Sequence, residues 1–520
     1  EYITKFNVYK KQEETIINNI AYLKTTYNPG DYTVPRVTVT NLTQPLTSAY
    51  GYAGIVAVIG AFPNNDQDIL SFSSYSKMLE YYGVEEGTAA EKAFNGLLAC
   101  KQILRTENHV YRQGATTVLV ANITEFSETG FTKAESLRVD GTKVMDDKGK
   151  VYKELSSYGL DKLGIPSGEQ ANFDISTLYD TVITIDKLNK VLNRLVVENF
   201  DFLFTADLFD ASVTTTTTVE VQTGEQEGEE PTEPVTETVT TTTRVLEPID
   251  AAERIQKFLD TEFRLQRPSQ YIAPLETADA GNEEDPVATV NVWESINETE
   301  ILAVKNIFTE DIFGLGGFYT QRIFIDYQTK PLSLIESAAY MMGYIASTQV
   351  GQPLTYRTIP GITGVYDEVS VGPKDTGYFL AKNGFPVIIC KRRDVTNRSS
   401  EFCVLNSTLP CGFDLSQVRA VSYLIKQYDL QQFLGLPNNE STRAKIGAEL
   451  SVVNQRVMND VKIIDYINSS NITIKEDEDG RLCPQEVFID LEVVVHGVII
   501  VINLGVTMEE EYYSISEREE

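Results

Sequence analysis

Residues 54–62 read GIVAVIGAF and residues 118–123 read VLVANI, two short and almost wholly apolar runs. This composition is typical of strands that are buried on both faces of a parallel sheet. The sequence between them contains SKMLEYYG and AAEKAFNGLLACKQIL, in which apolar residues recur at helical spacing. A strand, a helical connection and a second strand form a βαβ unit, so the sequence predicts an α/β body.

The same pattern continues further along the chain. Around residues 183–204, DKLNKVLNRLV (186–196) is predicted to be a helix and NFDFLFTA (199–206) a strand. A helix at 251–263, a strand at 318–327 and a small-residue helix at 333–347 follow, and the body is expected to end near Val365. Residues Gly314–Gly317 lack the GxGxxG frame and the Walker lysine, so they are interpreted as a flexible connection and not as a phosphate loop.

Two insertions interrupt this body. Residues 124–179 are polar and rich in turn residues, and Asp146–Gly149 is a hairpin signal, which predicts a small β-rich insertion. Residues 213–245 are a Thr, Glu and Pro tract in which two threonine runs flank an acidic centre. We expect the two runs to pair as a protruding hairpin, with an unstructured insertion as the alternative.

The C-terminal part predicts a compact α+β module. A strand at 385–392 precedes helices at 415–434 and 441–457, and strands at 461–474 and 487–504 follow. Residues 476–480, EDEDG, begin like a calcium loop but lack the glutamate at loop position 12. Because predicted strands flank them, we interpret them as a solvated hairpin turn.

Composition excludes several classes of function. Among 520 residues, 75 are acidic and 44 basic, a formal charge of −31 that repels nucleic acid, so no direct nucleic-acid partner is expected. The five cysteines are scattered without a CxxC pair, which favours a reducing compartment. The most apolar stretch, residues 493–502, is half of the roughly 20 residues that a membrane helix needs, so no membrane insertion is expected. The first residues show no apolar core of a secretion signal.

Catalytic chemistry has little support in the sequence. The two histidines, His109 and His496, have no metal-ligand partner at motif spacing, and the chain contains no GxSxG sequence. We therefore expect no metal, no cofactor and no enzymatic activity. A subtilisin-like or other α/β hydrolase stays open as the alternative, because a βαβ body does not fix function.

Both ends of the chain carry extended, strand-like sequence. Ile16, Ile17, Ile20 and Leu23 have helical spacing, Asn28-Pro29-Gly30 ends that helix, and residues 32–46 alternate apolar with polar side chains. An unpaired strand exposes backbone hydrogen-bonding groups and must be covered. A chain with such a strand at each end favours donation to a neighbour's sheet, and head-to-tail donation that does not close produces a helical polymer.

Several segments resemble one known family. YNPGDYTVPRVTVTNL and AYGYAGIVAVIGAF resemble the N-terminal arm and first strand of contractile tail sheath proteins of bacteriophages and phage-like injection systems. IESAAYMMGYIASTQVGQPLTYRTIPGITGV is similar to their helix-loop segment. NGFPVIICKRRD through VFIDLEVVVHGVIIVINL is similar to their C-terminal domain. The family often begins close to the Pro-Gly arm, whereas here about 26 residues precede it.

The resemblance implies a mechanical function. Subunits would polymerise around a tail tube, contact baseplate and tail terminator proteins, and contract to drive the tube through a cell envelope. The implied location is a virion tail assembled in the bacterial cytoplasm, and the sheath of a bacterial secretion or injection device is the alternative. The family's architecture places the C-terminal domain on the inside, so the helices at 415–434 and 441–457 are expected to face the tube.

The predicted fold class is therefore multidomain, α/β and α+β, with strand arms at both ends. The predicted ranges are an N-terminal extension and linker arm at 1–48, the first part of the body at 49–123, the β-rich insertion at 124–179, the remainder of the body at 180–365 with the protruding insertion at 213–245, the C-terminal tube-facing domain with its strand arm at 366–506, and an acidic tail at 507–520. Candidate residues of the inter-subunit arms are Tyr32, Val34, Val37, Val39, Leu42, Val498, Ile500, Ile502 and Leu504. Candidate tube-facing or interface charges are Lys426, Arg443 and Lys445.

Overall fold

The computed structural model describes most of the body and of the C-terminal module. The described residues are 54–64, 67–104, 114–126, 139–140, 143–145, 151–152, 179–206, 212–221, 235–244, 246, 248–274, 298–308, 315–319, 321–325, 329–369, 375–384, 386–393, 400–409, 413–461, 464–476 and 482–496.

A six-stranded sheet forms the centre of the body, with strand order β13-β12-β9-β1-β3-β2. The strands are β1 (Ile55–Gly60), β2 (Leu70–Phe72), β3 (Thr117–Asn122), β9 (Phe202–Thr205), β12 (Gln270–Pro274) and β13 (Leu315–Tyr319). β1 pairs parallel with β3 and with β9, which confirms the predicted βαβ unit. β2 is antiparallel to β3 at the edge and was not predicted.

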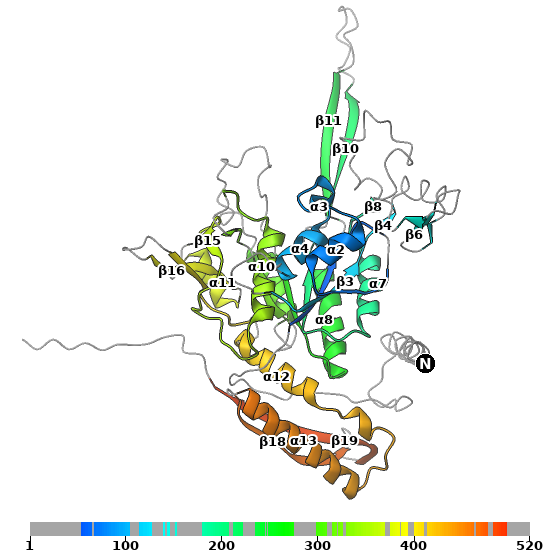
Figure 1. The fold of residues 1–520 in the computed structure, drawn as a ribbon, viewed down its shortest axis with the longest axis vertical. Coiled ribbons are helices and arrows are strands. Elements are labelled where there is room, and N and C mark those ends of the chain that lie inside the picture. Colours follow the sequence, from blue (N-terminus) through cyan, green and yellow to red (C-terminus); the bar gives the residue numbers. More distant parts are fainter. Residues whose placement is uncertain are drawn as a thin grey trace, which may run out of the picture.

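Helices pack around this sheet (Figure 1). They are α2 (Tyr75–Tyr82), α3 (Ala89–Lys92), α4 (Asn95–Leu104), α7 (Ile185–Leu195), α8 (Pro248–Arg264), α9 (Glu298–Phe308) and α10 (Leu334–Ser347). Ser333 caps α10 in a reciprocal pair with Glu336, and Thr184 caps α7. These helices confirm the helical segments predicted at 186–196, 251–263 and 333–347.

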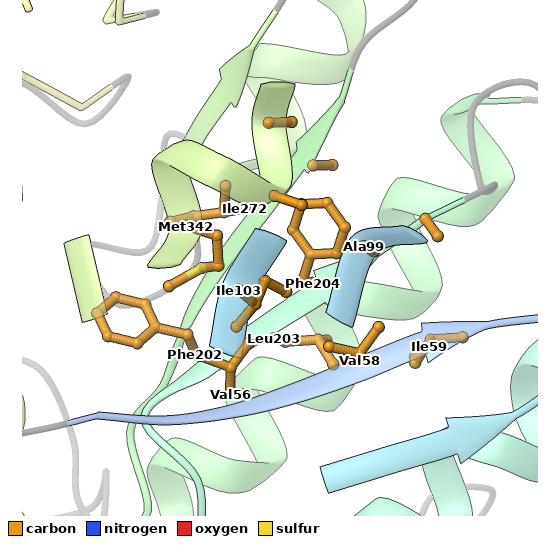
Figure 2. Close-up of a cluster of buried hydrophobic side chains, with 14 of the residues drawn as sticks. Val56, Val58, Ile59, Ala99, Ile103, Phe202, Leu203, Phe204, Ile272 and Met342 are labelled. Atoms are coloured by element: carbon orange, nitrogen blue, oxygen red, sulfur yellow. The ribbon is translucent and has the colours of Figure 1, made fainter. Parts of the chain in front are cut away.

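One part of the core lies between the strands and the helix pair α4 and α10, and buried side chains of α7 and α8 belong to the same cluster. Figure 2 shows fully buried side chains from β1, β9 and β12, among them Val58, Phe204 and Ile272, close to Ile103 of α4 and Met342 of α10. α10 approaches α4 closely at Gly343, where a Cβ atom would lie 2.8 Å from the carbonyl oxygen of Ile103. Glycine is therefore required at this helix crossing, because even the Cβ atom of alanine would meet the backbone of α4.

Part of the sheet departs from the sequence prediction. The expected flexible connection at Gly314–Gly317 is wrong, since Leu315–Gly317 lie within β13. The single strand expected at 318–327 is divided between β13 and β14 (Ile323–Ile325), which belong to different sheets. β12, which joins β9 to β13, was not predicted at all.

Both insertions contain the predicted β structure. In the first, β5 (Val139–Asp140), β6 (Lys143–Met145) and β7 (Val151–Tyr152) form a sheet, and the antiparallel pairing of β6 with β7 confirms the predicted hairpin. β4 (Glu125–Phe126) pairs with β8 (Tyr179–Asp180) at its base. In the second, β10 (Ser212–Val221) and β11 (Val235–Arg244) pair antiparallel and project from the body (Figure 1). The threonine runs therefore pair as expected.

Two small antiparallel sheets are formed by strands that flank and follow α10. β14 pairs with β15 (Ile362–Val365), and β16 (Ile388–Arg393) pairs with β17 (Ser400–Val404), with α11 (Thr376–Lys382) between them. The domain ranges stay a prediction, and packing groups the residues differently from the expected boundary at 365. Buried side chains from Leu380 to Val418 belong to the same hydrophobic cluster as the body.

The C-terminal module has a cluster of its own. α12 (Leu415–Gln427), the 3-10 turn η5 (Gln431–Phe433) and α13 (Glu440–Asp460) lead into β18 (Ile464–Glu476) and β19 (Leu482–Val495). β18 and β19 pair antiparallel around the acidic segment, which confirms the predicted hairpin. The predicted strand at 487–504 is described as far as Val495. No helix among the described residues is long and apolar enough to span a membrane.

Candidate functional site

Two places in the structure are candidates for function: the joint between α12 and the body, and the β18–β19 sheet. Asp414 caps the N-terminus of α12. Its carboxylate accepts from the Ser416 N–H at 2.8 Å, and its own N–H donates to Gln417 Oε1 at 2.7 Å. The hydroxyls of Ser407 and Ser416 also donate to this carboxylate. Asp414 is buried, so these hydrogen bonds anchor the first turn of α12. Burial raises the pKa of Asp414 despite them.

α12 is fixed to the edge of the sheet at which the parallel strands begin. Lys426 Nζ donates to Asp201 Oδ1 at 2.9 Å and to the carbonyl oxygen of Phe200. Asp201 Oδ2 accepts from the N–H of Ile55 at 3.0 Å. One carboxylate therefore connects the first residue of β1, the segment before β9 and the helix of the C-terminal module.

A buried arginine reinforces this joint. Arg419 is 2% exposed, donates to Thr348 Oγ1 at 2.8 Å and to the Thr348 carbonyl oxygen at 3.0 Å, and lies over the ring of Phe202. Burial lowers the pKa of Arg419 to about 10, although Asp201 acts in the opposite direction. Nearby, Gln270 Nε2 donates to Ser422 Oγ at 2.8 Å. These buried polar contacts give α12 one orientation on the body.

The β18–β19 sheet has only two strands. Its helix-facing side packs on α13 through residues such as Ile467 and Val493, which are paired across the strands. In the described part of the chain, β18 pairs only with β19 and β19 only with β18, so each strand has one outer edge without a strand partner. Such edges are the usual acceptors for an added strand.

The predicted site residues fall into two groups. The arm residues Tyr32, Val34, Val37, Val39, Leu42, Val498, Ile500, Ile502 and Leu504 lie outside the described residues, and their role stays a prediction. Lys426 is partly buried in the joint, with 12% of its side chain exposed. Arg443 is half-buried and donates to Asn438 Oδ1 at 2.8 Å, and Lys445 is exposed on α13.

The opposite edge of the sheet is where an α/β hydrolase would hold its catalytic groups. There Asn122 Nδ2 donates to the carbonyl oxygen of Asn64 at 2.8 Å, and Thr124 Oγ1 accepts from the Phe62 N–H at 2.9 Å. Arg194 donates to the Asn122 carbonyl oxygen at 3.0 Å. These side chains hold backbone segments together. Among the described residues, no group of three or more His, Cys, Asp or Glu is arranged to bind a metal ion.

Solved structures show similarity to the chain over most of its length. A sheath tail protein from Listeria innocua is 10% identical, over 86% of this chain and 96% of that protein, with a TM-score of 0.45. A sheath tail protein from Desulfitobacterium hafniense is 9% identical, over 88% of this chain and 100% of that protein, with a TM-score of 0.44. The helical sheath of the anti-feeding prophage in its contracted state is 12% identical, over 92% of this chain and 100% of that chain, with a TM-score of 0.43.

These three structures are all sheath proteins. No protein-family model matches the sequence, and no curated protein matches it.

The joint was not predicted from the sequence, although the helices and strands of the module that it attaches were. Asp201 and Lys426 are 225 residues apart, and no local pattern marks them as partners. Arg419 lies in a helix where an arginine is ordinarily expected on the solvated face. One signal was available: Asp414-Leu415-Ser416-Gln417 is a capping-box sequence, which fixes where α12 begins.

Proposed function

We propose that the chain is a structural subunit of a contractile tail sheath, which polymerises helically around a tail tube and contracts to drive that tube through a target envelope. Its partners in this proposal are further copies of itself, the tail tube protein, and baseplate and tail terminator proteins. The proposed role is mechanical and needs no catalytic site. Its proposed place is the tail of a virion or of a phage-like injection device, assembled in the bacterial cytoplasm.

The observation that carries the proposal is the open two-stranded sheet at the end of a firmly attached module. β18 has 13 residues and β19 has 14, long enough to accept a strand along either outer edge. α13 packs on one face of this pair of strands, and added strands would pair with the backbone groups that its two outer edges leave exposed. The module is thus suited to accept strands from other subunits.

The chain also contains sequences suited to be donated. Residues 32–46 alternate apolar and polar side chains, and residues 498–504 are a short apolar run. Each copy would then donate strands and accept them, through different surfaces. Such a heterologous contact produces a ring when the rotation between neighbours closes, and an open helix when it does not. Rings and helical stacks of rings are therefore expected.

Donated strands also suit a contracting polymer. A strand joined to the body through extended chain keeps two subunits connected while their bodies rotate and exchange one set of packed contacts for another. The buried joint of Asp201, Lys426 and Arg419 would hold each accepting module in a fixed orientation on its body during that movement. The stored energy would come from assembly, so the proposed movement requires no nucleotide.

Negative-stain electron microscopy of the purified chain at rising concentration tests the proposal. Hollow tubes or stacked rings are expected from the intact chain. Deletion of Gly497–Glu520 removes the C-terminal donated strand and is expected to leave a soluble monomer. Deletion of Thr507–Glu520 removes only the acidic tail and is the matched control, expected to form tubes. Long tubes from the larger deletion would refute strand donation by this arm, and compact particles from the intact chain at every concentration would refute the sheath proposal.

A further inference from the structure

The β18–β19 sheet has one face that α13 does not cover. Val487, Ile489, Leu491 and Val493 of β19 pack into the cluster with α13. Because side chains alternate along a strand, Phe488, Asp490, Glu492 and Val494 lie on the other face. On that face Tyr466 of β18 pairs with Val494 and is 48% exposed.

This uncovered face has apolar ends and an acidic middle. Tyr466 and Val494 form one end, and Phe488, opposite Thr473, lies toward the other. Between them, Asp490 and Glu492 are exposed. Large apolar side chains on an open sheet favour a covering helix, and the carboxylates favour one with basic residues at its rim.

The N-terminal extension has the sequence of such a helix. Ile16, Ile20 and Leu23 recur at helical spacing with Ile17 beside them, which predicts one apolar stripe. At 100° per residue, Lys24 lies beside this stripe. Lys5, Lys10, Lys11 and Lys24 give residues 1–26 four basic against three acidic side chains, an exception in a chain of charge −31.

A short connection joins this predicted helix to the predicted donated strand. Residues 27–31, YNPGD, lie between the helix and the strand that starts at Tyr32. Five residues span at most about 17 Å even when fully extended. A helix joined so closely to a strand packs on one face of the sheet whose edge that strand extends. α13 already covers one face of the β18–β19 sheet, which leaves the other for this helix.

We propose that residues 1–26 of one subunit form a helix that covers the uncovered face of the β18–β19 sheet in the neighbouring subunit, the one that receives the strand of residues 32–46. The inference rests on the proposed strand donation and adds a second contact to it. α13 and the donated helix then enclose the sheet from both sides. Ile16, Ile20 and Leu23 contact Tyr466, Phe488 and Val494, and Lys24 lies near the acidic middle.

Deletion of residues 1–26 tests the contribution of this helix while leaving the strand in place. Tubes are expected still to form, but to dissociate at a clearly lower urea concentration than tubes of the intact chain. Circular dichroism of the dissociated subunits controls for folding. Tubes of equal resistance to urea would overturn the helix proposal alone, and an intact chain that forms no tubes would overturn strand donation and the helix proposal together.

Disulfide trapping between two kinds of subunit identifies the contact itself. Copies carrying Ile20→Cys are mixed with copies carrying Phe488→Cys, both in a background whose accessible native cysteines are serine, and tubes are oxidised. A crosslinked dimer is expected, because the proposal places the thiol of one chain against the thiol of its neighbour.

The matched control replaces Phe488→Cys by Val452→Cys, on the exposed side of α13, where Val452 is 65% exposed. This pair is expected to give no dimer above background. Equal crosslinking of both pairs, or none with Phe488→Cys, would overturn the assignment of the helix to the uncovered face. A chain that carries both Ile20→Cys and Phe488→Cys tests the remaining arrangement. Crosslinks within this chain, with none between the singly substituted copies, would show that the helix covers its own sheet and would overturn the proposal.

Discussion

At the scale of single residues, several charged side chains of the body stabilise its fold through buried hydrogen bonds. Glu91 is 1% exposed; one carboxylate oxygen accepts from the Tyr75 hydroxyl at 2.5 Å and from Lys101 Nζ at 2.9 Å, and the other from the Gly87 N–H at 2.6 Å. Burial alone would raise the pKa of Glu91, but these hydrogen bonds outweigh it and lower the pKa below its usual value. The carboxylate thus closes the loop between α2 and α3.

Substitution Glu91→Gln is expected to destabilise the body by about 2 kcal/mol at pH 7, because charged hydrogen bonds are lost. A lowered folded-state pKa stabilises the fold above the unfolded pKa of about 4.3, and this contribution is lost as the pH falls through the folded-state pKa. The difference between the two proteins should therefore shrink as the pH falls toward about 3. Urea unfolding at both pH values measures it.

Glu86→Gln provides the comparison for this effect. Glu86 also pairs with Lys101, at 3.1 Å, but its side chain is 63% exposed. Its replacement should change the free energy of unfolding by less than about 1 kcal/mol at either pH. Equal losses for the two variants would contradict a special role for the buried carboxylate.

Residue roles of this kind were the part least accessible to sequence. Lys426 was predicted as a tube-facing or interface charge, and its contacts with Asp201 and Phe200 are found only because a helix near the C-terminus lies against the sheet. Arg419 has no sequence feature that separates it from a solvated helix residue. Local spacing describes an element, whereas these pairings depend on how distant elements meet.

At the scale of elements, α12 is attached to the body by an ion pair that is both short and largely buried. The side chains of Asp201 and Lys426 are 18% and 12% exposed, so water has little access to their ion pair. Removing one partner of a buried pair leaves the other charge uncompensated. Asp201 also accepts a hydrogen bond from the N–H of Ile55 in β1, so its loss affects both α12 and β1.

Substitution Asp201→Ala is therefore expected to lower the free energy of unfolding by about 3 kcal/mol. Hydrogen exchange should rise at both the start of β1 and the last turn of α12. The exposed pair of Lys190 and Glu125, 62% and 44% exposed, offers the control Lys190→Met, with an expected change within about 1 kcal/mol. A change at α12 without one at β1 would disprove the shared role of the carboxylate.

Elements were predictable where their pattern was long and regular. The buried strands β1 and β3 and the helices α7, α8, α10 and α13 follow directly from apolar spacing. β12 reads QYIAP, too short and too close to a proline to stand out, and β13 reads LGGFY, where two glycines suggested a loop. Both are held as strands by pairing with neighbours, which overrides weak local preference.

At the scale of the whole molecule, the charge of −31 opposes any polymer of identical chains. Repulsion between subunits extends about 30 Å at 0.01 M salt and about 8 Å at 0.15 M. The protein concentration needed for tube assembly should therefore be roughly tenfold higher at 0.01 M salt than at 0.15 M, a difference of ~1.4 kcal/mol per subunit. Sedimentation of tubes across a salt series measures this.

Urea unfolding of the monomer at the same two salt concentrations separates assembly from folding. If assembly responds to salt more strongly than folding, the repulsion acts between subunits. An assembly threshold independent of salt would contradict the expectation, and would mean that local charge pairs across the contacts compensate the overall field.

The position of β1 in the sheet determines how a tethered subunit would resist force. β1 is paired along Ile55–Gly60 with β3 and along Val56–Ile59 with β9, both in parallel. A pull on the chain before Ile55 runs along the strand, whereas the hydrogen bonds of both ladders lie across it. The bonds are then sheared together instead of being unzipped one after another. In the proposed polymer, a tether attached to this strand would therefore transmit tension to a neighbour while the sheet that anchors it stays intact.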